Sequence, residues 1–130
     1  VDISDAMLAQ ARRRCPWASL RQGAAESADI VSVLGEKPDR ILFSYCMSMF
    51  HEPFAALDNA RRSLAPNGKV LVADFGRMDR WNSVAFRAMR GFLDSFLVFE
   101  LDHDRLASLA REQQSGLGGF WSVMSFGPLD

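Results

Sequence analysis

Residues 39–46 read D-R-I-L-F-S-Y-C, and residues 69–75 read K-V-L-V-A-D-F. Each is an apolar run of strand length without the polar alternation of a half-exposed strand. Between them, Pro53 stands where a first helical turn tolerates proline, and apolar residues recur at helical spacing up to the A-P-N-G turn at 65–68. Strand, helix and strand over residues 41–75 predict a βαβ unit with parallel strands, a right-handed crossover and helices on both faces of the sheet.

The segments before this unit also read as α/β structure. Residues 1–3 resemble the end of a buried strand, and Ser4 is a suitable N-cap for a helix that runs to Arg14. A short strand is predicted over residues 18–22. A weak helix follows over residues 28–34, which Gly35 ends.

The segments after it contain two helical patterns and one strand. The helices are predicted over residues 81–96 and 104–113, and a turn at S-G-L-G-G leads into the strand F-W-S-V-M-S-F at 120–126. No linker, repeat or low-complexity tract interrupts the pattern. We therefore expect residues 1–130 to form one α/β domain, or part of one.

Composition excludes several classes of function. The net charge of −1 gives no global field that attracts nucleic acid, and no apolar stretch has the length of a membrane span or a signal peptide pattern. Cys15 and Cys46 are far apart and form neither a disulfide framework nor a metal-ligand pattern. A reducing compartment, the cytoplasm, is therefore the expected location.

Ligands of parallel α/β sheets bind at the carboxyl ends of the strands, which draws attention to three stretches. These are Asp2, residues 44–51 and residues 74–76. A carboxylate at a strand tip can accept hydrogen bonds from both hydroxyls of a ribose. Asp2 can equally be a helix-start charge that the helix dipole favours, and the local sequence leaves both interpretations open.

The run Y-C-M-S-M-F-H at 45–51 is unusual for a plain loop. Its methionines and aromatic residues can line an apolar pocket, and the ring of Tyr45 can face a cationic group. We expect Met47 and Met49 to be core residues beneath the next helix. We expect Ser44 and Tyr45, nearer the strand tip, to be functional.

The two histidines have no metal-ligand partners in the sequence. His51 precedes a helix, His103 lies beside a charged turn, and neither has a ligand at metal-binding spacing. No nucleophile elbow, phosphate-binding loop or Cys–His arrangement appears. We therefore predict no metal site.

The segment at 77–99 alternates arginines with bulky aromatic residues. One interpretation is an amphipathic helix that lies on an anionic membrane surface. The other, which we favour, is a helix whose apolar stripe covers the sheet while its arginines face solvent. That stripe would run from Trp81 through 84 or 85 and 88 or 89 to Phe92.

Taken together, V-D-I-S-D-A-M-L-A-Q-A-R, D-R-I-L-F-S-Y-C-M-S-M-F and L-A-P-N-G-K-V-L-V-A-D-F-G resemble the class I S-adenosylmethionine-dependent methyltransferases. The resemblance implies a Rossmann-like three-layer sandwich with a mostly parallel, seven-stranded sheet. It also implies S-adenosylmethionine as cofactor. More narrowly, S-Y-C-M-S-M and V-A-D-F-G are similar to N-methyltransferases that act on amine headgroups of lipids.

The resemblance assigns roles to particular residues. Asp2, with Ile3 beside it, matches the acidic strand tip that binds the cofactor ribose. Gly23, Ala24 and Ala25 match the residues that flank the adenine, although Ala24 stands where the family often has an aspartate for the adenine amine. Ser44 and Tyr45 would lie beside the transferred methyl group, with Tyr45 steering the acceptor amine. His51 is the candidate for removing its proton.

Two parts of the family fold have no expected counterpart in this sequence. The first strand with its glycine-rich loop has no match in residues 1–130, and the last of the seven strands is expected to be absent because the chain stops at G-P-L-D. The predicted fold is therefore incomplete and leaves unpaired sheet edges.

The predicted function is methyl transfer to a small-molecule or lipid-headgroup amine, with peripheral membrane contact through residues 77–99. The alternative is an inactive methyltransferase-like fragment that serves as an interaction module. Such a module would pair its exposed sheet edges with another chain, including a second copy of itself.

Overall fold

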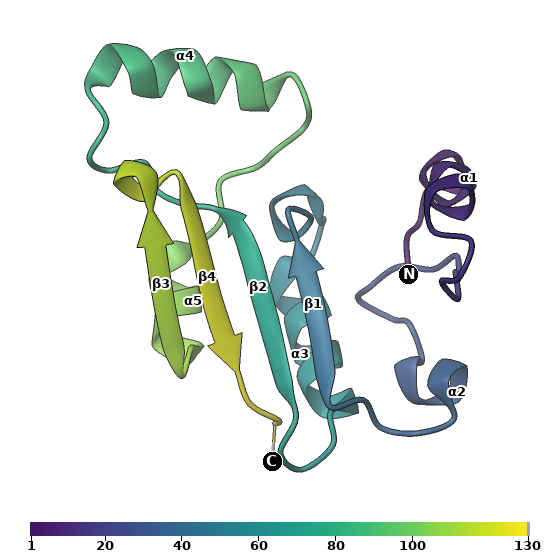
Figure 1. Ribbon diagram of the computed structural model, residues 1–130. Coiled ribbons are helices and arrows are strands. Elements are labelled where there is room, and N and C mark those ends of the chain that lie inside the picture. Colours follow the sequence, from purple (N-terminus) through teal and green to yellow (C-terminus); the bar gives the residue numbers. More distant parts are fainter. Residues whose placement is uncertain (130) are drawn as a thin grey trace.

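The computed structural model describes residues 1–129 and contains a four-stranded mixed sheet in the order β1-β2-β4-β3 (Figure 1). The strands are β1 (Arg40–Ser44), β2 (Lys69–Phe75), β3 (Glu112–Gly116) and β4 (Trp121–Phe126). β1 and β2 are parallel, whereas β4 is antiparallel to both of its neighbours. The predicted α/β, Rossmann-like fold, incomplete relative to seven strands, is confirmed. The predicted domain boundary at Asp130 lies outside the described residues.

The βαβ unit has the predicted parallel strands and connecting helix, but the predicted helix cover on both faces is missing over β1, where Leu42 is exposed. Helix α3 (Pro53–Ser63) connects β1 to β2, with Pro53 in its first turn, where proline costs no helical hydrogen bond. The parallel register places Phe43 opposite Val72. Both side chains lie in the core, so the apolar runs read from the sequence are strands that one helix layer covers.

The C-terminal part corrects two predictions. Helix α5 (His103–Leu109) ends earlier than predicted, and β3 occupies residues that we assigned to a helix and a turn. The polar run E-Q-Q-S-G forms this strand because it pairs with β4 across the short helix η2 (Leu117–Gly119). If residues 41–46 are the fourth strand of the family, then β2, β3 and β4 supply the remaining three. The expectation that the last strand is absent is therefore wrong.

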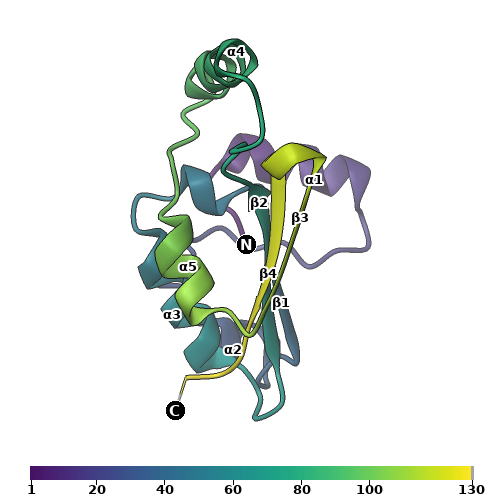
Figure 2. The same ribbon diagram turned by 90° about the vertical axis from the view of Figure 1, so that its left-hand side faces the viewer.

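Helices α3 and α5 cover one face of the sheet (Figure 2). The main core lies between them and the strands and includes Leu57, Leu106 and Phe126, all nearly inaccessible to solvent. On the opposite face Leu42 is 62% exposed. Within residues 1–129, β1 also has no paired strand on the side away from β2.

The N-terminal segment lies beyond β1 and contains α1 (Asp5–Arg14) and α2 (Ile30–Leu34) (Figure 1). The predicted strand at 18–22 is reduced to a single parallel bridge between Asp2 and Gln22. The prediction that residues 1–3 end a buried strand is wrong for this structure, since Val1 and Ile3 are more than 60% exposed. One bridge provides too few contacts to bury them.

Helix α4 (Ser83–Asp94) begins at Asn82, whose side chain accepts hydrogen bonds from two backbone N–H groups of the first turn. It lies above the carboxyl end of β2 rather than flat on a sheet face (Figure 1). Leu93 packs in a second apolar cluster with Met78 and Val98. The predicted stripe is only partly correct, because Phe92 is 59% exposed and the inward face runs through Phe86, Met89 and Leu93 instead.

Candidate functional site

The carboxyl end of β1 leads into a strained residue. Tyr45 has a φ of +50°, in the left-handed region that non-glycine residues rarely occupy. Its backbone N–H donates a hydrogen bond to the carbonyl oxygen of Ala73 at 2.7 Å, which ties this residue to β2. Because such strain persists only where the surroundings enforce it, Tyr45 is a candidate for a functional position.

The side chain of Tyr45 lies beside the end of β2. Its ring packs edge-on against Phe75 with 5.0 Å between the ring centroids, and the residue remains 45% exposed. Ser44, one residue earlier, is also exposed. The structure therefore brings Ser44 and Tyr45 to the strand ends with an aromatic surface open to a ligand.

A buried carboxylate fixes the segment that follows Tyr45. Asp74 is 1% exposed, and its carboxylate accepts hydrogen bonds from the Ser48 N–H, the Ser48 hydroxyl and the Phe75 N–H at 3.1, 2.8 and 2.8 Å. Ser48 belongs to the short helix η1 (Met47–Met49). The sequence placed Asp74 at a strand end but gave no sign of its partner 26 residues away.

The two methionines of this segment have different environments. Met47 is fully buried in the main core, as predicted, whereas Met49 is 53% exposed, so its assignment to the core is wrong. At three residues per turn, Met47 and Met49 point in different directions from this 3-10 helix, and only Met47 faces the core. His51 is also exposed, beyond the end of η1.

Cys46 is the one titratable side chain within residues 44–47 other than Tyr45. Burial, with smaller contributions from the carboxylates of Asp74 and Asp2, raises the pKa of the Cys46 thiol to about 11. The thiol is therefore protonated near neutral pH and is a poor nucleophile.

Asp2 and Gly23 lie together in the N-terminal segment beyond β1. The Gly23 N–H donates to the Asp2 carbonyl oxygen at 3.1 Å, and the Asp2 carboxylate accepts a hydrogen bond from the Ser4 N–H at 2.8 Å. The Asp2 carboxylate thus stabilises the start of α1, the second role that the sequence left open. Asp2 is only partly buried, so the carboxylate keeps acceptor capacity for a ligand.

The residues after Gly23 are held by α3. Asn59 donates hydrogen bonds from its side-chain amide to the carbonyl oxygens of Ala25 and Ala28, at 2.9 and 3.0 Å. Ala24 accepts backbone hydrogen bonds that close a turn. This segment therefore has a fixed backbone conformation, although it offers no polar side chain at Ala24 or Ala25.

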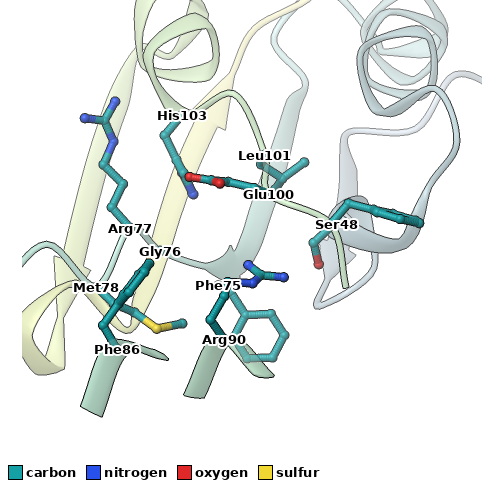
Figure 3. Close-up of a pocket in the computed structure, with 11 residues that line it drawn as sticks. Ser48, Phe75, Gly76, Arg77, Met78, Phe86, Arg90, Glu100, Leu101 and His103 are labelled. Atoms are coloured by element: carbon teal, nitrogen blue, oxygen red, sulfur yellow. The ribbon is translucent and has the colours of Figure 1, made fainter. Parts of the chain in front are cut away.

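A small cavity of about 20 Å³ lies at the carboxyl end of β2, with room for about one water molecule. Phe86 and Arg90 reach it from α4, Ser48 from η1, and Glu100 and His103 from the segment that enters α5 (Figure 3). The complete lining consists of Ser48, Phe75, Gly76, Arg77, Met78, Phe86, Arg90, Phe99, Glu100, Leu101 and His103.

An open depression of about 510 Å³ adjoins this cavity and shares four of its lining residues: Arg77, Glu100, Leu101 and His103. Arg77 forms an ion pair there with Asp104. Burial and the nearby Arg77 charge lower the pKa of His103, and the surrounding carboxylates oppose that shift only in part. His103 is therefore neutral near pH 7 and able to accept a proton.

Ser48, Phe75 and Gly76, from two of the stretches that the carboxyl-end rule singled out, line the small cavity. None of the residues to which the resemblance gave a role lines the cavity or the depression. The sequence excluded His103 as a metal ligand but did not recognise it as a pocket residue. The only local signal was its position just after a charged turn and at the start of a helix. Its approach to β2 depends on a chain reversal after α4 that no local pattern predicts.

Comparison with known proteins identifies the family of this chain. A family model described as a methyltransferase domain matches residues 1–114. No curated protein sequence matches the chain at a significant level.

Several solved structures share the fold. The citrinin polyketide synthase CMeT domain has a TM-score of 0.64 and 19% identity, over 98% of this chain and 38% of that chain. PH0226 from Pyrococcus horikoshii OT3 has a TM-score of 0.63 and 17% identity, over 98% and 69%. A TehB-like SAM-dependent methyltransferase from Corynebacterium glutamicum ATCC 13032 has a TM-score of 0.55 and 17% identity, over 98% and 65%. At these identities the likeness shows the fold alone.

Proposed function

The chain belongs to the methyltransferase domain family, and on this premise we propose that it takes part in S-adenosylmethionine-dependent methyl transfer to a small-molecule or lipid-headgroup amine. The observation that carries the proposal is Tyr45 at the carboxyl end of β1, where its partly exposed ring packs on Phe75 at the end of β2. Asp2, bonded to Gly23 through the backbone, is proposed to hold the cofactor ribose. The chain spans 38% of the citrinin synthase domain chain, so the activity is proposed for the complete natural protein.

Asp2 and the residues near it fit the nucleoside part of the cofactor. The half-exposed Asp2 carboxylate has lone pairs left after its bond to the Ser4 N–H and can accept from two ribose hydroxyls. Ile3, Gly23, Ala24 and Ala25 are proposed to border the nucleoside. Since Ala24 has no acceptor side chain, the adenine amine would be recognised through backbone groups.

Ser44 and Tyr45 fit the groups that react, the methyl group of the cofactor and the acceptor amine. When bound, the cofactor supplies a methyl group on a positively charged sulfur. The exposed face of Tyr45 can stabilise a nearby cation, and the Phe75 ring holds Tyr45 in place. Ser44 and Tyr45 thus align the reactants and exclude water, which is the main contribution a protein makes to a direct displacement.

The proposed activity is tested with the complete natural protein and methyl-labelled S-adenosylmethionine. We expect label transfer to at least one member of a panel of primary amines and of amine-headgroup lipids, with release of S-adenosylhomocysteine. Neutral lipids and alcohols of similar size serve as negative controls. Transfer to none of the amines, with saturable cofactor binding by calorimetry, would contradict the acceptor class.

The alternative function is an interaction module, which the unpaired side of β1 and the exposed Leu42 support. Calorimetry distinguishes the two functions. A complete natural protein that binds no cofactor but forms concentration-dependent oligomers would support the module and contradict the enzyme.

A lipid acceptor requires the protein to contact a membrane surface. Helix α4 and the segment after it form a surface suited to that contact. Phe92 in the last turn of this helix and Phe96, Leu97 and Phe99 in the segment after it are each more than 55% exposed. Arg87 is exposed on the same helix. Aromatic residues beside cationic ones can insert at the interface of an anionic bilayer, which would make a cytoplasmic protein peripherally membrane-bound. Among residues 1–129, no helix has the length and apolar composition needed to cross a membrane.

The double substitution Phe92→Ser and Phe96→Ser is expected to weaken binding to anionic vesicles at least tenfold, because two exposed rings lose their insertion into the interface. The measurement is sedimentation with phosphatidylcholine vesicles that contain phosphatidylglycerol. Trp17→Ser is the matched control, since Trp17 is 84% exposed but lies outside residues 77–99. Equal binding by the double variant and the wild type would refute the membrane contact.

A further inference from the structure

The position of His103 sets it apart from the other titratable groups. It lines both the small cavity at the end of β2 and the open depression beside it. Phe75 lines the same cavity and also packs on the ring of Tyr45. A group that enters through the depression would therefore meet His103 before it reaches the Phe75–Tyr45 pair.

The charges that face His103 are largely compensated, with one exception. Arg77 is paired with Asp104, and Arg90 binds both Asp94 and the carbonyl oxygen of Val98. Asp102 caps α5 by accepting from the Arg105 N–H, and the carboxylate of Asp74 is occupied by Ser48 and Phe75.

Glu100 is the exception. It is exposed, and its side chain lines both hollows together with that of His103 (Figure 3). The depression therefore presents an accessible negative charge beside a group that can accept a proton.

From this geometry we propose that Glu100 and His103 form the acceptor end of the active site, with Glu100 attracting a cationic primary amine and His103 taking its proton. This inference rests on the proposed methyl transfer and deepens it. It also assigns the base to a different histidine from His51, which is exposed and lines neither hollow.

An ammonium group R–NH₃⁺ enters past Glu100 and gives one proton to the neutral His103 ring, which leaves R–NH₂ with a free lone pair. The nearby carboxylates, Glu100 among them, stabilise the imidazolium that forms and offset in part the cost of its burial. The lone pair then forms a bond to the methyl carbon, while the carbon–sulfur bond breaks and leaves its electron pair on sulfur. His103 returns its proton to water through the open depression.

Kinetics of the complete natural protein test the role of His103. We expect His103→Gln to lower kcat about 100-fold or more with little change in the KM of the amine. In the wild type, kcat/KM should rise with pH through the lowered pKa of His103, because the base is active only when neutral. That rising limb should be lost in His103→Gln. If His51→Gln loses activity instead and His103→Gln does not, the inference is wrong.

Glu100→Gln separates attraction from proton transfer. This variant should raise the KM of the amine about tenfold at low salt, with kcat retained, since an exposed charge acts mainly on substrate capture. Because the Glu100 carboxylate raises the pKa of His103, its loss should also move the rising limb to lower pH. If neither the KM of the amine nor the pH dependence of kcat/KM changes, Glu100 is not part of the site.

A binding experiment without turnover separates this inference from the proposed function. Histidine C2–H resonances of the complete natural protein are followed by NMR during titration with ethanolamine, and with glycolate as an anionic control. The His103 and His51 resonances are assigned with the His103→Gln and His51→Gln variants. We expect ethanolamine, but not glycolate, to shift the His103 resonance. A shift without methyl transfer would retain the amine subsite and contradict the methyltransferase activity, whereas methyl transfer without any shift would contradict the subsite alone.

Discussion

Asp74→Ala is expected to lower the free energy of unfolding by about 3 kcal/mol or more. The carboxylate is 1% exposed and accepts three hydrogen bonds, two of them from backbone N–H groups. Alanine would leave these buried donors without partners, and each unsatisfied donor costs about 1–3 kcal/mol. Urea denaturation of the variant and the wild type gives the difference.

Two further variants show whether the loss arises from these hydrogen bonds. Asp39→Ala removes an exposed carboxylate just before β1 and should change stability by less than about 0.5 kcal/mol. Asp74→Asn keeps one acceptor oxygen and should cost less than Asp74→Ala. If Asp74→Ala destabilises no more than Asp39→Ala, the carboxylate does not fix the segment that carries Tyr45.

Asp2→Ala is expected to weaken binding of S-adenosylhomocysteine by the complete natural protein about 100-fold. Two hydrogen bonds from ribose hydroxyls to a carboxylate are worth about 1.5–3 kcal/mol each, and about 1.4 kcal/mol corresponds to a factor of ten in affinity. Asp2→Asn keeps one acceptor and should lose about tenfold. Calorimetric titration measures both losses directly, without turnover.

Asp5→Ala is the matched control, because it removes an exposed carboxylate from the first turn of the same helix α1. Its affinity for S-adenosylhomocysteine should remain close to that of the wild type. Circular dichroism checks that α1 still forms in Asp2→Ala, since the carboxylate also accepts the Ser4 N–H. Equal losses in Asp2→Ala and Asp5→Ala would indicate a general charge effect and rule out ribose recognition by Asp2.

The central βαβ unit could be predicted from the sequence because its signals are local. Continuous apolar runs form β1 and β2, and Pro53 begins α3 at the predicted position. β3 could not be predicted, because its polar residues show no alternation and its strand conformation depends on pairing with β4. An edge strand of this kind takes its conformation from its partner, not from its own side chains.

The candidate site could be predicted only in part. The rule that ligands bind at the carboxyl ends of parallel strands drew attention to Asp2, Ser44 and Tyr45. The family match supports the methyltransferase interpretation. Their roles in binding stay predictions, as does that of His51.

By itself, the sequence determined the family, the βαβ unit and the starts of α1 and α3, since each depends on residues close together in the chain. Only the tertiary structure decided that Asp74 binds Ser48, 26 residues earlier, and that His103 and Glu100 meet the end of β2. It also decided which aromatic residues of α4 face solvent. These features depend on long-range packing, which brings together groups whose local sequences contain no information about one another.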